Sequence, residues 1–322
     1  MIAIMNRQFF LFFVIVVLAV TFVACVGGGA NITMVTENEN ISFYMAGSGN
    51  VTIDWGDENV ANSMLYEERS EFSHNYSIES SYIIKITGEN ITYLNCSNNG
   101  LTGLDVSKNS GLRELNCGSN QLIELDVSSN TALTHLEFGA NRITNIDISK
   151  NTGLTYVSYW NNQFTSLDVS KNTALTELRC ANNKLISLDV SNNIALTELR
   201  CHNNQLTSLN VSNNNILERL WCYGNQLTSL DVSNNNMLGF LWCSTNQLTT
   251  SELNTLFGTL HSNSVSPFSI TGTLRPIITA EGKLIRIGNN PGTNDCDRNI
   301  AVDKGWSVDD INITATSVQI QI

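Results

Sequence analysis

The stretch Leu175-Thr-Glu-Leu-Arg-Cys-Ala-Asn-Asn-Lys-Leu-Ile-Ser-Leu-Asp-Val-Ser-Asn-Asn-Ile-Ala195 is one copy of a unit that occurs eight times between Leu94 and Leu248. Each copy follows the previous one after 21 residues, with no insertion. The position of Cys180 is held, in chain order, by Cys96, Cys117, Phe138, Tyr159, Cys180, Cys201, Cys222 and Cys243. A fixed period of this size predicts a solenoid, because one unit has too few apolar side chains to close a core alone.

Polar and apolar residues alternate from Glu177 to Ala181, with Leu178 and Cys180 as the apolar members. This period of two predicts a short strand with one buried face, and stacking turns the strands into a mainly β, parallel sheet with a spacing of about 4.8 Å. The interior is completed from the far side of the coil by Leu185, Leu188 and Val190. The pattern L-x-x-L-x-C-x-x-N-x-L resembles the leucine-rich repeat, which implies a right-handed coil with a concave parallel sheet.

An asparagine recurs three residues after the cysteine position in every copy. The members of this column are Asn99, Asn120, Asn141, Asn162, Asn183, Asn204, Asn225 and Asn246. A side-chain amide can both donate to and accept from backbone groups where the chain turns. We therefore expect a buried hydrogen-bond ladder with a structural role.

The six repeat cysteines are interpreted as buried thiols. They share an inward position with Phe138 and Tyr159, so the position requires apolar bulk, and a buried free cysteine behaves as a small hydrophobe. The strand spacing exceeds the Cβ separation of about 3.5–4.5 Å that a disulfide needs. The sequence contains no C-x-x-C pair, which is the spacing that would indicate a metal site. We expect these thiols to be protected from alkylation in the native protein.

Charge composition bears on the class of partner. The chain has 17 basic and 29 acidic residues, giving a formal net charge of −12. This balance repels phosphate backbones, so nucleic-acid binding is not expected.

The first 30 residues have the composition of an export signal. Arg7 precedes an apolar run from Phe9 to Val26, and Cys25 is followed by Val-Gly-Gly-Gly. The segment resembles a bacterial lipoprotein signal, although Phe22 stands where that family prefers leucine. The resemblance implies a cleaved peptide over 1–24, a lipid on Cys25 and a short tether over 25–30. An uncleaved membrane anchor is the alternative. Both predict an exported protein, and the first predicts an outer-membrane lipoprotein facing either the cell surface or the periplasm.

Residues 31–92 contain β-prone segments without the repeat. Trp55-Gly-Asp57 and Phe72-Ser-His74-Asn-Tyr76 resemble elements of PKD-type sandwich domains, and the short length favours a partial sandwich. Asp57 and His74 suggest acid–base chemistry, but no nucleophile or metal set accompanies them, so we expect them to pack and hydrogen-bond. The segment is expected to cover the open edge of the first repeat.

After the repeats at 93–249, residues 250–322 lose the period. Apolar spacing after a Thr/Ser cap predicts a helix over Thr250–Leu260. A strand at Lys283–Gly288, a short helix at Cys296–Lys304 and a strand at Trp306–Val308 are also expected, with a β-prone tail from Ser307 to Ile322. This region is interpreted as an irregular α+β closing cap, and its scattered acidic residues lack the spacing of a calcium loop.

The cysteine-containing unit of 21 residues resembles internalin-type leucine-rich repeats, especially those with a cysteine column. The whole arrangement resembles leucine-rich-repeat lipoproteins of gut Bacteroidetes, including the closing motif Gly288-Asn-Asn-Pro-Gly-Thr-Asn-Asp-Cys-Asp-Arg298. This resemblance implies an extracytoplasmic adhesion or recognition protein, and it implies no enzymatic reaction. The residues after Cys25 are not the acidic surface-export signal of many such proteins, so the face of display stays open.

The outward strand positions form the predicted binding surface on the concave face. Its candidate residues are Tyr156, Trp160, Arg179, Arg200, His202, Arg219, Trp221, Tyr223, Phe240 and Trp242. Exposed Trp, Tyr and Arg are enriched at binding hot spots. Packing on the C-terminal cap, above all for Phe240 and Trp242, or simple cross-strand pairing is the alternative. The band from Glu177 and Arg179 to Glu198 and Arg200 is expected to form a charge lattice that selects the partner.

Two classes of partner fit this surface. An extracellular or envelope protein would use the aromatic residues as anchors and the charges as a rim. Alternatively, a polysaccharide would stack on Trp221 and Trp242, with Arg200 and His202 as donors. Catalysis is not expected, because the four histidines belong to separate segments and assemble no triad or metal set. The sequence thus predicts a monomeric recognition protein without catalytic residues, metal or cofactor, with an enzyme accessory subunit as a remote alternative.

Overall fold

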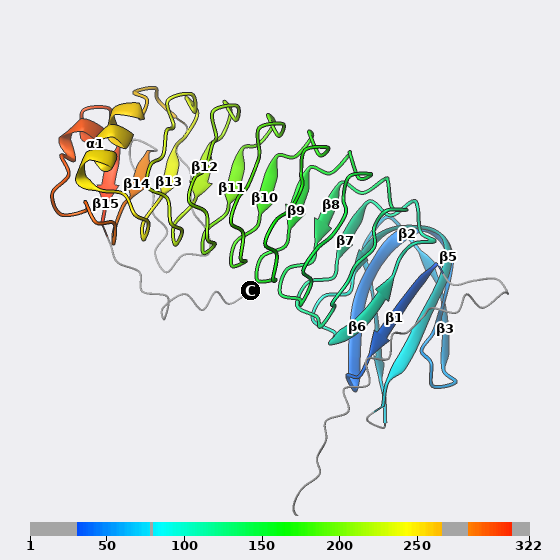
Figure 1. The fold of residues 1–322 in the computed structure, drawn as a ribbon. Helices are drawn as coiled ribbons and strands as arrows, with labels where there is room; N and C mark the ends of the chain where they lie inside the picture. The colour runs from blue at the N-terminus through cyan, green and yellow to red at the C-terminus, as the bar shows by residue number, and fades with distance from the viewer. Residues whose placement is uncertain (1–30, 78–79, 266–282, 311–322) are drawn as a thin grey trace, which may run out of the picture.

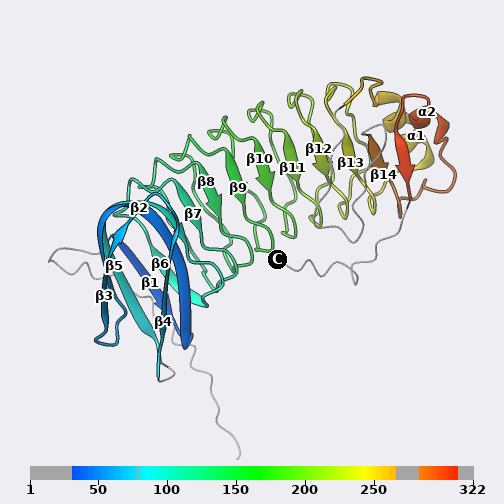
Figure 2. The same cartoon turned by 180° about the vertical axis from the view of Figure 1, so that it is seen from behind.

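A parallel β-sheet with one short strand per coil runs along the chain. The computed structural model describes residues 31–77, 80–265 and 283–310. Figures 1 and 2 show the coils stacked in a row, with their strands side by side. The repeat strands are β7 (Glu114–Asn116), β8 (His135–Glu137), β9 (Tyr156–Ser158), β10 (Glu177–Arg179), β11 (Glu198–Arg200), β12 (Arg219–Trp221) and β13 (Phe240–Trp242). The predicted leucine-rich-repeat solenoid is confirmed.

The register of the sheet follows directly from the period of 21 residues. Leu178 lies opposite Leu199, and Leu199 lies opposite Leu220. All three leucines are fully buried, as are the residues at the cysteine position two places later. Because the coils are equal in length, side chains at equivalent positions of the repeats lie in the same layer of one continuous core.

The repeat cysteines lie inside this core. All six are free and have 0% exposed surface, so the expected burial is confirmed. Burial raises the pKa of both Cys180 and Cys243 to about 12. In Cys201 the pKa is raised first by burial and then by the neighbouring Cys180 thiol. The reactive thiolate is thus disfavoured at neutral pH.

The expected asparagine ladder is confirmed. In Asn204, Nδ2 donates to the carbonyl oxygens of Cys180 and Cys201 at 3.0 Å each, and Oδ1 accepts from the Leu185 N–H at 3.0 Å. One side chain thus ties together its own coil and the coil before it. The first member, Asn99, exchanges two hydrogen bonds with the backbone of Ser42 instead, at 2.8 and 2.7 Å.

A second asparagine ladder was not anticipated from the sequence. Its buried members are Asn109, Asn130, Asn151, Asn172, Asn193, Asn214 and Asn235. In Asn193, for example, Nδ2 donates to the carbonyl oxygens of Val169 and Asn172 at 3.0 and 2.9 Å. The signal was present in the repeated D-V-S-x-N segment, whose last asparagine also recurs every 21 residues. Both turns of each coil are therefore held by an amide.

The N-terminal segment continues into the solenoid without a break in hydrogen bonding. Its strands are β1 (Ile32–Thr36), β2 (Asn40–Asp54), β3 (Val60–Leu65), β4 (Ser70–Asn75), β5 (Tyr82–Asn95) and β6 (Leu101–Asp105). Strand β5 pairs antiparallel with β1 and β2, and its final residues pair parallel with β7. The expected boundary at residue 92 thus falls inside one strand, and this shared strand covers the first edge of the repeats.

Asp57 and His74 take the structural role expected of them. The His74 Nε2 atom lies 2.7 Å from Asp57 Oδ2. The His74 ring stacks on Trp55 with centroids 4.9 Å apart, and the Tyr76 hydroxyl donates to the Trp55 carbonyl at 2.8 Å. These four residues fasten the loop after β2 to strand β4.

The closing region contains the expected helices and strands, namely α1 (Thr250–Thr259), β14 (Leu284–Arg286), α2 (Asn299–Val302) and β15 (Ser307–Asp309). Strands β14 and β15 extend the parallel sheet beyond β13. Asn290 also extends the first ladder, because its Oδ1 accepts from the Asn246 N–H at 3.1 Å. The interpretation as an irregular cap was therefore incomplete: the region adds further coils after an insertion that contains α1.

Three sequence-based predictions fall outside the described residues. These are the signal peptide over 1–24, the lipid on Cys25 with its tether, and the tail beyond residue 310. Among the residues that the structure does describe, no helix has the length and apolarity needed to cross a bilayer.

Candidate recognition surface

We call the side of the parallel sheet that faces away from the main core, from β8 to β14, the outer face. All ten candidate residues lie on it or directly after its strands. Parallel pairing places Arg200 of β11 beside Trp221 of β12, and Trp221 beside Trp242 of β13. The inward neighbour Leu220 belongs to the main core, whereas Trp221 belongs to a separate apolar cluster.

A charge lattice occupies the centre of this face, as expected. Glu198 is buried, and its carboxylate lies 2.5 Å from Arg200 Nε and 2.8 Å from Arg219 Nε. Arg179 Nε contacts Glu177 and lies 4.0 Å from Glu198. Burial alone would raise the pKa of Glu198, but the arginines outweigh it and hold that pKa below its ordinary value. In Glu177, burial and the neighbouring Glu198 raise the pKa.

Aromatic rings form a stack across three neighbouring strands. The centroids of His202 and Tyr223 are 4.4 Å apart, and those of Tyr223 and Trp242 are 4.2 Å apart. The Arg200 guanidinium lies 4.5 Å from the centroid of the Trp221 ring. The strand repeat explains the contact between His202 and Tyr223, which hold equivalent positions on strands about 4.8 Å apart. Tyr223 and Trp242 hold different positions in their repeats, so their stacking is a diagonal contact between neighbouring coils.

The exposure expected for the C-terminal aromatic residues is wrong. Phe240 is 0% exposed, Trp221 5% and Trp242 8%. They pack against one another and against Leu284 of β14, while the Arg286 guanidinium lies 4.7 Å from the centroid of the Trp242 ring. The alternative of packing within the closing region describes these three residues better, because β14 extends the sheet past them.

The accessible part of the outer face is its central stretch, which we call the open segment. It consists of the partly exposed residues Tyr156, Trp160, Arg179, Arg200, His202, Arg219 and Tyr223. The side chains of Arg179, Arg200 and Arg219 are 35%, 33% and 32% exposed. The structure thus brings seven of the ten candidates to an accessible surface and buries the other three.

Trp160 owes its position to a glycine in the preceding coil. A Cβ atom on Gly139 would lie only 2.4 Å from Trp160 Nε1. The indole therefore lies across Gly139, where any larger residue would displace it. This contact fixes one aromatic border of the open segment.

Several residues of the outer face were absent from the candidate set. Glu137 is half-buried, and burial raises its pKa despite the opposing charge of Arg179. His135 stacks on Tyr156 at 5.9 Å, and Arg286 pairs with Asp309 at 3.1 Å. The strand register could have identified Glu137 and His135, since both hold outward positions of β8. Arg286 lies beyond the end of the period, which concealed it.

The neutral imidazole of His202 predicts an acid-sensitive fold. Burial, aided by the Arg200 charge, lowers its pKa from 6.5 to about 3. As the pH falls from 6.5 toward 3, the unfolded chain binds a proton that the folded chain does not, so stability is lost over that window. We expect a loss of about 2 kcal/mol between pH 7 and pH 4 from this residue, less than the full linkage because the ring is partly exposed.

Denaturant unfolding at pH 7, 5.5 and 4 measures this dependence. His202→Gln is expected to lose less stability in acid than the wild type, whereas His135→Gln, at an exposed position, is expected to behave as the wild type does. Equal acid losses in all three proteins would contradict the buried neutral imidazole.

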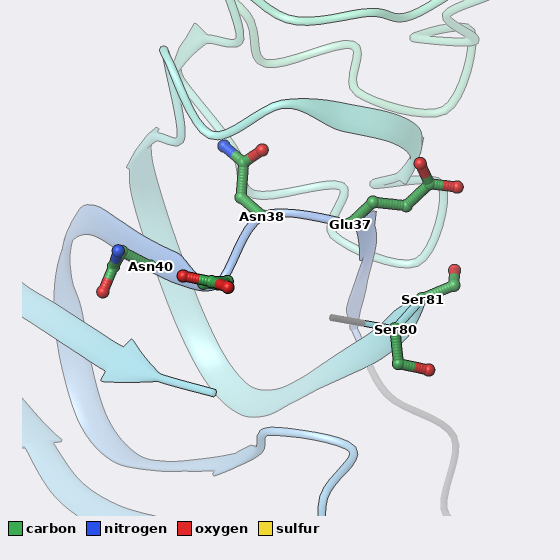
Figure 3. Close-up of a pocket in the computed structure, with 6 residues that line it drawn as sticks. Glu37, Asn38, Asn40, Ser80 and Ser81 are labelled. Carbon is green, nitrogen blue, oxygen red and sulfur yellow. The ribbon is translucent and has the colours of Figure 1, made fainter. Parts of the chain in front are cut away.

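A polar hollow lies away from this face, in the N-terminal segment. It is lined by Glu37, Asn38, Glu39, Asn40, Ser80 and Ser81, near the turn between β1 and β2 and the start of β5 (Figure 3). It contains neither a histidine nor a cysteine. Within ranges 31–77, 80–265 and 283–310, no group of three or more His, Cys, Asp or Glu residues could hold a metal ion.

Comparison with known proteins places the fold. No protein-family model and no curated protein matches the chain. The chain is similar to the functional domain of InlJ from Listeria monocytogenes, described as including a cysteine ladder, with 34% identity and a TM-score of 0.53 over 66% of this chain. It spans 47%, about half, of that structure's length. The parallel sheet of repeated coils and this similarity define the class of leucine-rich-repeat proteins. This chain is a leucine-rich-repeat protein.

The chain is also similar, at lower TM-scores, to two other solved structures. Internalin C2 from Listeria monocytogenes has 23% identity and a TM-score of 0.48, covering 52% of this chain and 77% of its own. A leucine-rich-repeat protein of Leptospira interrogans has 19% identity and a TM-score of 0.43, covering 63% of this chain and 62% of its own.

Proposed function

We propose that this chain is a non-enzymatic recognition protein of the cell envelope, and that the open segment of its outer face binds an extracellular or envelope protein. The observation that carries the proposal is the arrangement of three partly exposed arginines on neighbouring strands, bordered by Tyr156 and Tyr223. Arg and Tyr are enriched at protein-binding hot spots. Holding them on a rigid sheet lowers the entropy cost of binding.

A protein partner is favoured over a polysaccharide by the burial of the aromatic strip. Sugar rings need an accessible aromatic face, and Trp221 and Trp242 have lost theirs to neighbouring rings and guanidinium groups. The remaining accessible surface is mixed in charge and flanked by separate aromatic residues. This composition is typical of a protein interface, where charged groups surround a few aromatic anchors.

A non-catalytic role is supported by the placement of the histidines in the described residues. His74 pairs with Asp57, His135 stacks on Tyr156, and His202 stacks on Tyr223. His261 Nε2 lies 2.8 Å from the Leu238 carbonyl oxygen. Each imidazole thus has a structural neighbour on a different element. The Thr134 hydroxyl, 3.0 Å from His135 Nδ1, is a contact on the exposed surface, whereas a catalytic nucleophile and base are expected to lie in a pocket.

Envelope attachment through a lipid on Cys25 remains part of the proposal and rests on the sequence of residues 1–30. Growth with a radiolabelled fatty acid tests it, since the full chain is expected to incorporate the label and Cys25→Ala is expected not to. Equal labelling of both would remove the lipid from the proposal and leave the recognition surface untouched.

Site-directed photo-crosslinking tests the recognition surface. The full chain in detergent carries p-benzoylphenylalanine either in place of Tyr156, on the open segment, or in place of Gln163, on an exposed loop of the same coil. With extracellular and envelope proteins as targets, we expect a saturable adduct from position 156 that unlabelled wild type suppresses, and none from position 163. Equal adducts from both positions, or adducts from 163 alone, would reject the surface.

A further inference from the structure

The three arginines of the open segment use only one side of their guanidinium groups within the protein. Every ion pair of Arg179, Arg200 and Arg219 with Glu177 or Glu198 is made through Nε. The two Nη nitrogens at the end of each group are not used by these carboxylates. Because a guanidinium carries five N–H donors in a fixed planar fork, each side chain keeps its end for a further acceptor.

The orientation of these side chains is set by their neighbours. Arg200 is fixed from the side by Glu198 and from below by the Trp221 ring, 4.5 Å from its guanidinium carbon. Arg179 is similarly held by Glu177 and lies 5.3 Å from the centroid of the Tyr156 ring. Two contacts on each guanidinium restrict its rotation, so a ligand would find the donors already in place.

The spacing of the donors follows from the sheet. Arg179 and Arg200 hold the same position on β10 and β11, and Arg219 lies on β12, the next strand (Figure 1). Adjacent strands are about 4.8 Å apart, so Arg179 and Arg200 lie side by side. Arg219 pairs with Glu198, so it lies one strand further and two residues before Trp221, the partner of Arg200. The three groups thus form a short, bent row across the sheet. The pitch between Arg179 and Arg200 is close to the separation of about 5–6 Å between acidic side chains at i and i+3 or i+4 on one face of a helix.

We infer that the row binds the carboxylates of an acidic segment of the partner protein, a statement that rests on the proposed function. Arginine and carboxylate match in bidentate geometry, and such charge-assisted pairs are among the stronger hydrogen bonds. The alternation of Glu177 and Glu198 with the arginines opposes a continuous polyanion, because these carboxylates repel its evenly spaced charges. The net charge of −12 adds to that repulsion at longer range. A few discrete carboxylates on a protein reduce both penalties, because they carry less charge than a polyanion and can lie opposite the arginines.

Paired peptide arrays test the inference. The full chain in detergent is applied to synthetic peptides that each occur in an Asp/Glu form and in an isosteric Asn/Gln form, with heparin as a separate probe. Fluorescence anisotropy then measures the Kd of the tightest peptide for the wild type, Arg200→Gln and Arg200→Lys. Arg179→Gln repeats the test on a second strand, and Arg142→Gln is the matched control, because Arg142 is exposed and pairs with Gln121 outside this face.

We expect the acidic forms to bind and the amide forms to bind at least about tenfold more weakly. Arg200→Gln and Arg179→Gln should each weaken the acidic peptide by about tenfold. Arg200→Lys should restore only part of the affinity, because an ammonium keeps the charge without the planar fork. Arg142→Gln should bind as the wild type does.

Equal binding of acidic and amide peptides, or wild-type affinity in both glutamine variants, would overturn the inference. So would the absence of any peptide binding. Tighter binding of heparin that is lost in the same variants would also overturn it, in favour of a sulfated polysaccharide. The proposed function is tested separately, since a specific adduct from position 156 can persist when the carboxylate dependence fails.

Discussion

Replacing Trp221 by alanine is expected to lower the local stability of the C-terminal coils by about 3–5 kcal/mol, as for other buried tryptophans. The side chain is 5% exposed, and its ring lies 4.9 Å from Phe240 and 4.5 Å from the Arg200 guanidinium. Truncation leaves a cavity that the rigid sheet can fill only in part. Native-state hydrogen exchange of the Cys201 and Cys222 amides, whose N–H groups bond to β12 and β13, reads out the loss.

Trp160→Ala is the matched control, since the same residue type lies partly exposed on the same face. Its expected cost is about 1 kcal/mol, because little apolar surface leaves a buried site. Similar costs for the two variants would contradict the division between a buried cluster and an open segment.

Replacing Asn204 by leucine is expected to cost about 3–5 kcal/mol, because it leaves several buried backbone groups without partners. The amide bonds to the Leu185 N–H and to the carbonyls of Cys180 and Cys201, and leucine has a similar size but no polar atom. Hydrogen exchange should accelerate in the coils of β10, β11 and β12. It should change little in β1 to β4, because each coil contacts chiefly its neighbours.

The control for this variant is Gln205→Leu at the adjacent exposed position. A change within about 0.5 kcal/mol is expected, as for most surface substitutions. If Asn204→Leu proved equally mild, the ladder would not be a main support of the turns.

The inward and outward positions of each coil could be predicted, because the repeat continues through the sequence without interruption. Cys180 and Asn183 recur every 21 residues, so one assignment of inward and outward positions applies to all eight copies. The strand register, the buried thiols and the first asparagine ladder all follow from that period. The second ladder follows from it too, because Asn193 and its equivalents recur with the same period.

Burial on the outer face could not be predicted in the same way. Alternation assigns Trp221 and Trp242 to one side of the sheet, but it does not say whether another strand covers them. That strand, β14, comes after the insertion, and Asn290 follows Asn246 by 44 residues instead of 21. The shared strand β5 was similarly hidden, because its first half belongs to a segment without the repeat.

The central claim is that the arginine row faces outward while the cysteines of the same coils face the core. Pulse alkylation of native Arg200→Cys, with adducts located by peptide mass spectrometry, tests it most directly. The account predicts rapid modification at position 200 and protection of Cys180, Cys201 and Cys222. Protection of position 200 together with rapid modification of Cys201 would contradict it and remove the proposed recognition surface.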